Sequence, residues 1–168
     1  MDIIKVKPDV LVCKSDICLF DSSTISYLKL IAEHSPKKRA RLCAHHFDDD
    51  ILHEMLIVLH KDTYIQPHKH FNKTESFHVV EGSAEVLLFD VNGLIKKRIK
   101  LAAKSKDTPF FYRLNADTHH TVLVKSQYFV FVETTNGPFR MDATEYANWA
   151  PPSDAMPDRI KKYQESLN

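Results

Sequence analysis

The sequence has little net charge, few cysteines and no long apolar segment, and each shortage excludes a class of protein. Its 23 basic and 22 acidic side chains leave a formal net charge of +1, which provides no broad positive field for a nucleic acid or an anionic membrane. No run approaches the ~18 consecutive apolar residues of a membrane helix. Residues 1–8 mix charged and apolar side chains without a signal-peptide core. We therefore expect a cytoplasmic protein with no nucleic-acid or membrane partner.

The three cysteines point to the same compartment. Cys13, Cys18 and Cys43 are an odd number and form no C-x-x-C pair. Cys13 and Cys18 are close enough in sequence for a bridge, but reduced and partly buried thiols are the expected state. Histidine, by contrast, is plentiful, with ten residues of which nine fall between positions 45 and 120.

The N-terminal part of the chain predicts one helix. Apolar residues recur at helical spacing over residues 21–33, and Ser22 or Ser23 is placed to cap the first turn. Pro36 ends this helix, because the residue before a proline is driven out of the helical region. The basic run 37–41 that follows is expected to be a solvated connection.

The middle of the chain predicts a β-structure. Seven short segments are rich in β-branched and aromatic residues and are separated by turn signals, of which Asn92 and Gly93 form the clearest hairpin turn. The segments are 52–59, 75–80, 84–89, 95–101, 110–114, 121–124 and 128–133. This number and spacing predict an antiparallel sandwich or barrel.

The chain is expected to form one structural domain. Residues 1–36 would be an extension packed on the barrel, residues 37–142 the barrel itself, and residues 143–168 a tail on its outside or against a second subunit. Two prolines after Trp149 interrupt regular structure, and residues 157–167 are typical of a short polar helix.

A cluster of potential metal ligands lies in the segment QPHKHFNKTESFHVVEG at residues 66–82. On a strand, His68 and His70 point to the same face. Glu75 opens the next predicted strand and would present a carboxylate across a short connection from these two imidazoles. Three ligands are therefore expected from one short stretch of chain.

The fourth ligand is expected much later in the sequence. His120 alternates with Val122 and Val124, so it faces the interior if the valines do, and His119 then faces away. Three imidazoles and one carboxylate suit several divalent transition metals, including Zn, Ni, Fe and Mn, and the ligand types do not select one of them.

The pattern H-x-H-x4-E-x6-G followed by a strand-initial histidine resembles the two metal motifs of the cupin superfamily. The resemblance implies a mainly β fold, a cupin double-stranded β-barrel or jelly roll with one metal inside it, here with an N-terminal helix and a short C-terminal helical tail. The chain departs from this pattern at three places, which are Asp62, the stretch 115–117 and Val124, and from the narrower family described next at His119.

A narrower likeness is to the WbuC family of cupin metalloproteins. It is carried by RLCAH at residues 41–45, HEMLI at 53–57, YIQPHKH at 64–70, NKTES at 72–76 and Tyr112-Arg113. It covers roughly residues 20–140. This resemblance implies an association with the O-antigen and surface-polysaccharide gene clusters, and the superfamily resemblance implies a homodimer.

Several further residues are candidates for roles near the metal. An anionic substrate such as a sugar nucleotide needs fixed cations and polar groups, for which the candidates are Arg41, Lys73, Arg113 and Tyr64. A proton could be moved by His45, Glu54 or Tyr112. The sequence assigns no role to His46 and places His78 on the outside.

Three functions remain open at this point. The first is Lewis-acid chemistry on a sugar or sugar nucleotide, as an isomerase, epimerase or hydrolase. The second is a non-haem metal-dependent oxygenase. The third is a non-enzymatic module in which the metal stabilises the barrel and the pocket binds a saccharide. Whether the chain is an enzyme is not determined by its sequence.

Overall fold

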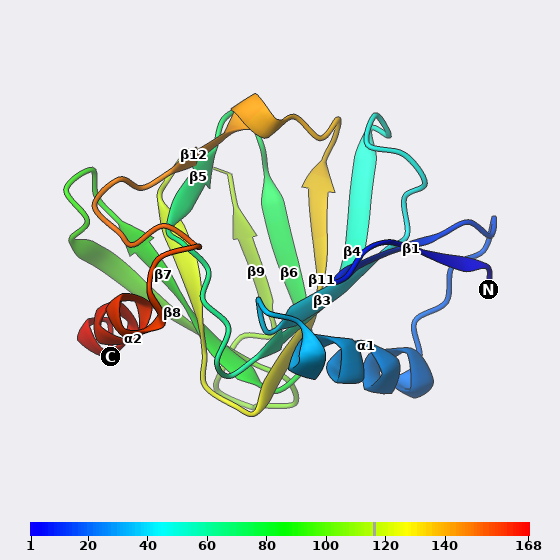
Figure 1. Cartoon of the computed structure of the whole chain (residues 1–168), viewed down its shortest axis with the longest axis horizontal. Helices are drawn as coiled ribbons and strands as arrows, with labels where there is room; N and C mark the ends of the chain where they lie inside the picture. Colours follow the sequence, from blue (N-terminus) through cyan, green and yellow to red (C-terminus); the bar gives the residue numbers. More distant parts are fainter. Residues whose placement is uncertain (116) are drawn as a thin grey trace.

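The computed structural model describes residues 1–115 and 117–168, and its strands form two sheets (Figure 1). The larger sheet has the order β1 (Ile3–Lys7), β2 (Val10–Cys13), β3 (Arg39–Cys43), β4 (Leu52–His60), β11 (Tyr128–Asn136), β6 (Glu75–Glu81) and β9 (Phe111–Leu114). The smaller sheet has the order β12 (Thr144–Tyr146), β5 (His68–His70), β10 (His120–Val124), β7 (Ser83–Phe89) and β8 (Ile95–Ala102). All seven predicted strands are present.

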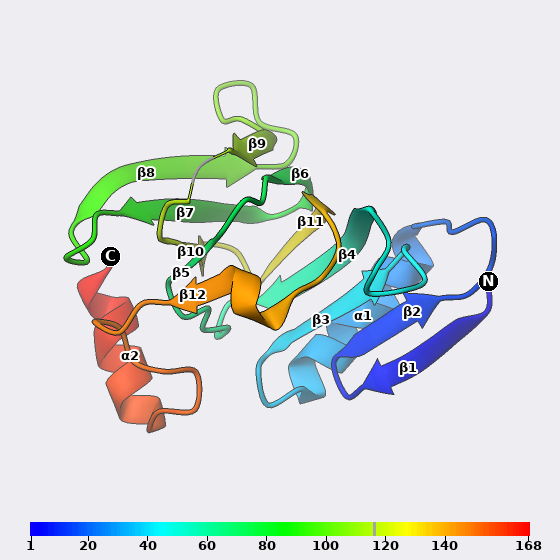
Figure 2. The same cartoon turned by 90° about the horizontal axis from the view of Figure 1, so that it is seen from above.

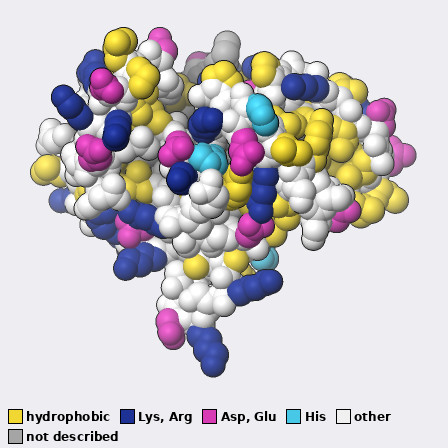
Figure 3. All heavy atoms as spheres, turned by 60° about the horizontal axis from the view of Figure 1, so that its bottom comes forward, with side chains coloured by type: hydrophobic (Ala, Val, Ile, Leu, Met, Phe, Trp, Pro, Cys, Tyr) yellow, Lys and Arg dark blue, Asp and Glu magenta, His cyan; other side chains and the backbone are white. Residues whose placement is uncertain are grey.

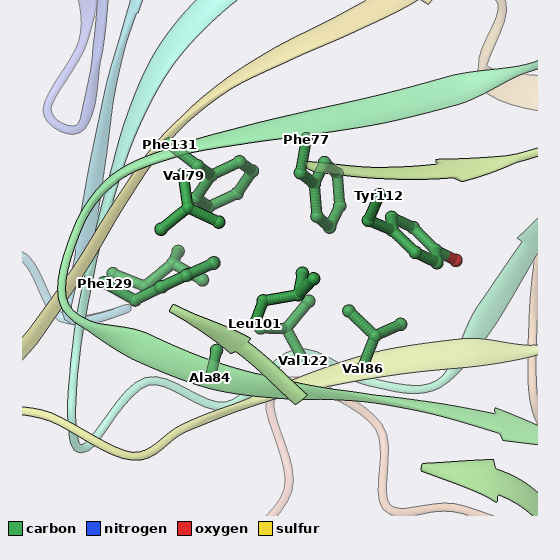
Figure 4. Packing of buried hydrophobic residues seen from close by; sticks show 10 residues of the cluster. Phe77, Val79, Ala84, Val86, Leu101, Tyr112, Val122, Phe129 and Phe131 are labelled. Atoms are coloured by element: carbon green, nitrogen blue, oxygen red, sulfur yellow. The ribbon is translucent and has the colours of Figure 1, made fainter. Parts of the chain in front are cut away.

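The two sheets face each other and close around a hydrophobic interior (Figure 4). Every second side chain of the strands points into this interior. The almost fully buried examples are Phe77 and Val79 of β6 and Phe129 and Phe131 of β11. The opposing sheet contributes Val86 of β7, among others. This arrangement confirms the predicted mainly β, jelly-roll barrel of the cupin type, with one helix before it and one after it.

The strand β3 replaces the solvated connection expected at residues 37–41. Arg39 to Cys43 pair antiparallel with β4 on one side, and part of β3 pairs parallel with β2 on the other. The charges are compatible with a strand because Arg39 and Arg41 occupy one face, while Ala40 and Leu42 on the other face are buried. The prediction of a solvated connection was wrong, because the basic residues at 39 and 41 alternate with buried apolar residues, which is the pattern of a strand.

The helix α1 (Ser22–His34) confirms the predicted N-terminal helix. Its cap is Asp21 rather than Ser22 or Ser23, because the Asp21 carboxylate accepts hydrogen bonds from the backbone N–H and the hydroxyl of Thr24. Leu28 and Ala32 pack on the outer face of the larger sheet. Figure 2 shows that the hairpin β1–β2 continues this sheet past the barrel, with α1 lying along it.

The C-terminal segment covers the smaller sheet. Its strand β12 pairs with β5, and the helix α2 (Pro157–Ser166) follows at the left in Figure 1, near β7 and β8. Leu167 packs with Leu87 and Phe89 on the outer face of β7. A short 3-10 helix, η1 (Met141–Ala143), precedes β12.

The turn between β7 and β8 links the barrel to this tail. Gly93 has a φ of +84°, as the predicted hairpin turn requires, and a side chain at this position would collide with the ring of Trp149. Neither helix among the described residues has the length and apolar character needed to span a bilayer.

Candidate metal centre

Three histidines from two strands converge inside the barrel. His68 and His70 lie on β5, and His120 begins β10 directly opposite His68 in the register. One ring nitrogen from each imidazole lies within 4.8 Å of the others. The pairing of β5 with β10 therefore brings together residues about fifty positions apart, as strand alternation predicted.

The second ring nitrogen of each histidine is held by the surrounding chain. Nδ1 of His68 donates to the Gln66 carbonyl oxygen at 2.8 Å, and Nδ1 of His120 donates to the Thr118 carbonyl oxygen at 2.9 Å. Nδ1 of His70 lies 2.9 Å from the Thr144 hydroxyl. Since each Nδ1 has a partner, each Nε2 is left as the nitrogen for a metal, and such contacts fix the orientation of metal-binding imidazoles.

Glu75 of β6 lies beside this group of three histidines. Its Oε1 lies 3.2 Å from Nε2 of His120, and its Oε2 lies 3.9 Å from Nε2 of His70. The Oε1 atom is buried and has no hydrogen bond with acceptable geometry among the described residues. A buried carboxylate oxygen without a partner is costly, and a cation between it and the three Nε2 atoms would satisfy it.

Burial and charge set the protonation of these ligands. Burial lowers the pKa of His68 to about 3, with repulsion from His120 adding to the effect. Burial also lowers the pKa of His70. Burial alone would lower the pKa of His120, but the adjacent Glu75 carboxylate outweighs it and holds that pKa above the usual value. Two imidazoles are thus neutral in the metal-free protein, and the third forms an ion pair with Glu75.

The donor set fits a divalent transition metal. Three imidazole nitrogens and one carboxylate oxygen are ligands that Zn, Ni, Fe and Mn all accept. The neutral imidazoles of His68 and His70 bind a metal without first losing a proton, whereas His120 releases the proton that pairs it with Glu75. The residues described here could hold one such ion, and they do not distinguish between these metals.

The centre opens into a cavity of about 330 Å³. Apolar side chains from both sheets form part of its wall, among them Ile57, Leu59, Phe77 and Val122. The volume lies at the small end of the range for pockets that bind small molecules. A metal held by the four ligands would therefore face a space large enough for a small substrate.

Glu133 of β11 is a second carboxylate in this cavity, although the sequence pattern predicted only that it lies in a strand. Burial raises its pKa to about 7, and repulsion from Glu75 contributes to the rise. The alternation of Phe129, Phe131 and Glu133 was the available signal, because the two phenylalanines fill the barrel interior and share their face with Glu133.

The four predicted substrate-binding residues lie in different places. Arg41 lines the cavity, and the other three are not among its lining residues. Lys73 is partly buried with Nζ 5.9 Å from the ring centre of Phe139. Arg113 is exposed and donates to the Asn115 side chain, while the Tyr64 hydroxyl donates to the carbonyl oxygen of Pro151.

The three predicted proton carriers also lie outside the set of cavity-lining residues. Glu54 is exposed. His45 stacks on His53, with ring centroids 4.0 Å apart. Tyr112 is buried beside Phe77 in the barrel, and its hydroxyl has no hydrogen-bond partner among the described residues. Their roles in catalysis stay predictions.

The remaining histidines differ in their burial and in the residues that they contact. His119 points away from the metal ligands, yet it is buried, because Trp149 and Glu145 of the C-terminal segment cover it. His78 is exposed, as its position three residues after Glu75 indicated. His46 is partly buried, with Nε2 3.2 Å from the carbonyl oxygen of Ser15.

Comparison with known proteins adds a family model and several solved structures. A model described as a domain of unknown function (DUF6016) matches residues 20–101. No curated protein matches the sequence significantly.

Among solved structures, protein SO0799 from Shewanella oneidensis is 11% identical, with a TM-score of 0.49, over 61% of this chain and 66% of its own. Oxalate decarboxylase from Bacillus subtilis is 16% identical, with a TM-score of 0.44, over 58% of this chain and 24% of its own. Procruciferin, an 11S globulin from Brassica napus, is 13% identical, with a TM-score of 0.45, over 56% of this chain and 23% of its own. The chain thus spans about two thirds of the first protein and about a quarter of the other two.

The two-sheet barrel and the histidine group together support a place in the cupin superfamily. The narrower WbuC resemblance stays a prediction.

Proposed function

We propose that the chain binds one divalent transition metal through His68, His70, Glu75 and His120 and uses it to act on a small polar molecule. The observation that carries the proposal is the arrangement of the three imidazoles. Each is fixed through Nδ1 and has Nε2 directed to a shared point at a cavity of about 330 Å³. A purely structural histidine cluster has no need of a cavity in front of it.

A bound divalent metal supplies Lewis acidity, which polarises a carbonyl or hydroxyl oxygen of a substrate. The chain provides the other requirements of such a reaction. Phe77 and Val122 keep part of the cavity wall apolar and exclude water. Glu133 lies in the same cavity and is placed to accept a proton at a carboxylate oxygen and return it. Isomerisation, epimerisation and hydrolysis all use these parts.

The nature of the substrate is the finer part of the proposal. We propose a sugar or sugar derivative from surface-polysaccharide (O-antigen) biosynthesis, an assignment that rests on the WbuC resemblance. Neutral polar lining residues such as Gln66 and Thr144 are compatible with a hydroxylated ligand.

The metal content of the purified protein tests the proposal. Mass spectrometry should find about one transition metal per chain in the wild type, and a large loss in His70→Ala and Glu75→Gln. His78→Ala is the matched control, because this exposed histidine lies three residues from Glu75 without facing the site. Wild-type protein that takes up no metal after reconstitution, or that loses none in the variants, would overturn it.

The two alternative functions give different results in the same preparation. An oxygenase would require iron and would consume dioxygen with candidate substrates. A non-enzymatic module would bind saccharides saturably without converting them. Turnover of a sugar substrate by protein loaded with a redox-inactive metal would favour the Lewis-acid function over both.

A homodimer is a further part of the proposal. Figure 3 shows hydrophobic side chains gathered at the right of the face in view, and the N-terminal hairpin, α1 and the segment that joins them leave several large apolar residues exposed. These are Ile4, Val6, Ile17, Leu19, Tyr27 and Leu30. Exposed apolar patches of this kind mark interaction sites. Light scattering after size exclusion should give the mass of two chains, and a Leu30→Glu variant should give that of one.

A further inference from the structure

Two arginines of the strand β3 point into the cavity beside the metal centre. Arg39 and Arg41 are two positions apart, so they share one face of the strand. Leu59 and Ile57 lie directly opposite them on β4. All four residues line the cavity. The strand register therefore fixes both guanidinium groups on the wall of the same space that the three histidines enter.

Neither guanidinium has an ion-pair partner among the residues that the structure describes. Among the described residues, no carboxylate oxygen lies within 4.0 Å of a nitrogen of Arg39 or Arg41. Nε of Arg41 is buried and has no hydrogen-bond partner. A buried charged donor without an acceptor is costly. The cavity wall thus contains a charged donor to which no described protein group offers an acceptor, and which a ligand in the cavity can satisfy.

The charges around these arginines favour an anion. The cavity is lined by four lysine or arginine side chains and by three carboxylates, which are Lys7, Lys37, Arg39 and Arg41 and Asp9, Glu75 and Glu133. Glu75 is a ligand in the proposed metal centre and would be neutralised there. A guanidinium binds carboxylate and phosphate groups through two parallel hydrogen bonds, and two guanidiniums on one wall strengthen this preference.

We propose that Arg39 and Arg41 form an oxyanion subsite that binds a carboxylate or phosphate group of the substrate. The inference rests on the proposed function, and it makes the substrate a small anion with one oxygen at the metal centre and a negative group at β3. The small cavity favours a single phosphorylated or carboxylated ring, or a smaller molecule, over an enclosed sugar nucleotide.

Calorimetric titration of metal-loaded protein with inorganic phosphate, and separately with acetate, tests the subsite. Arg39→Gln and Arg41→Gln should each weaken binding of the preferred anion by about tenfold or more, in line with the loss of one charge-assisted contact. Arg41→Lys keeps the charge without the paired hydrogen bonds and should weaken binding less. Arg159→Gln is the matched control, since this exposed arginine lies on α2 and should leave binding unchanged.

The outcomes separate this inference from the proposed function. A preference for phosphate or for acetate identifies the anionic group and supports the subsite. Binding that is unaffected by all the β3 variants, or absent for both anions, would overturn it. His70→Ala protein is titrated in parallel: if the wild type contains no metal but still binds the anion through the two arginines, the metal proposal fails and the subsite stands. If metal is present and the β3 variants bind anions normally, the metal proposal stands and the subsite fails.

Discussion

The Thr144 hydroxyl lies 2.9 Å from Nδ1 of His70, although the two residues are 74 positions apart. Their strands are paired, and Thr144 is the direct register partner of His70. The C-terminal segment thus joins the smaller sheet and also orients an imidazole of the candidate metal centre. A tail that only covered the barrel would have no such effect on the centre.

Replacing Thr144 with valine should weaken metal binding about tenfold, because outer-sphere contacts of ligating histidines contribute on this scale. Valine has a similar shape and removes only the hydrogen bond. The dissociation constant is measured by competition with a chelator. Thr134→Val, on the face of β11 opposite Glu133, should leave it unchanged. Equal affinity in the Thr144 variant and the wild type would show that the hydroxyl does not position His70.

Glu133 should make the metal-free protein less stable as the pH rises. Its pKa is raised from 4.5 to about 7 by burial, with Glu75 adding to the rise. Between these two values the folded state holds more protons than the unfolded state, so stability falls with increasing pH. Glu133→Gln should therefore gain stability relative to the wild type at about pH 8, on the order of 1–3 kcal/mol, and gain little at about pH 5.

Urea denaturation of both proteins at the two pH values measures this difference. Glu165→Gln, a substitution at an exposed position of α2, serves as the control for the loss of one negative charge. A stability difference between the Glu133 variant and the wild type that does not change with pH would contradict the raised pKa.

The stacked pair of His45 and His53 should have the opposite pH dependence. Burial lowers the pKa of both imidazoles below 6.5, and repulsion from His53 adds to the shift of His45. The unfolded state then binds more protons just below pH 6.5, so stability is lost as the pH falls through this value. His53→Phe keeps an aromatic ring against His45 and removes one titrating group. Its unfolding free energy should fall less steeply upon acidification, and an unchanged slope would rule out this pair as a source of acid sensitivity.

Gly82, the glycine that ends the first metal motif, should not tolerate a side chain. Its φ is +79°, and a Cβ atom would lie 2.0 Å from the backbone oxygen of Tyr128. Gly82→Ala should lower the free energy of unfolding by on the order of 2 kcal/mol or more, because strain and collision act together. The neighbouring Ser83→Ala should have little effect. Thermal denaturation measures both, and a stable Gly82 variant would mean that the β6–β7 turn can rearrange.

Much of the fold was readable from local patterns. The alternation of apolar and polar residues located the strands, and the same alternation placed His68 and His70 on one face and Glu75 with Phe77 on another. The choice of His120 over His119 followed from its neighbours Val122 and Val124. These predictions succeeded because the alternation of side chains between the two faces of a strand follows from residue numbers within that strand alone.

Only the tertiary structure showed what shares the cavity with these ligands. Arg39 lay in a basic run that predicted solvent exposure. The alternation of Glu133 with Phe129 and Phe131 indicated a shared face but not that this face borders the three histidines. Glu54 had the residue type of a proton carrier but is exposed. Alternation shows which residues of one strand share a face, but it does not show which of the two faces the opposing sheet covers.

By itself, then, the sequence predicted seven of the strands, the helices at either end and which histidines share a face, because each depends on spacing along one segment. The tertiary structure decided which cations and carboxylates surround that set and that Thr144 orients His70. Those relationships arise from the pairing of strands distant in the chain, which is fixed by the closure of the barrel as a whole.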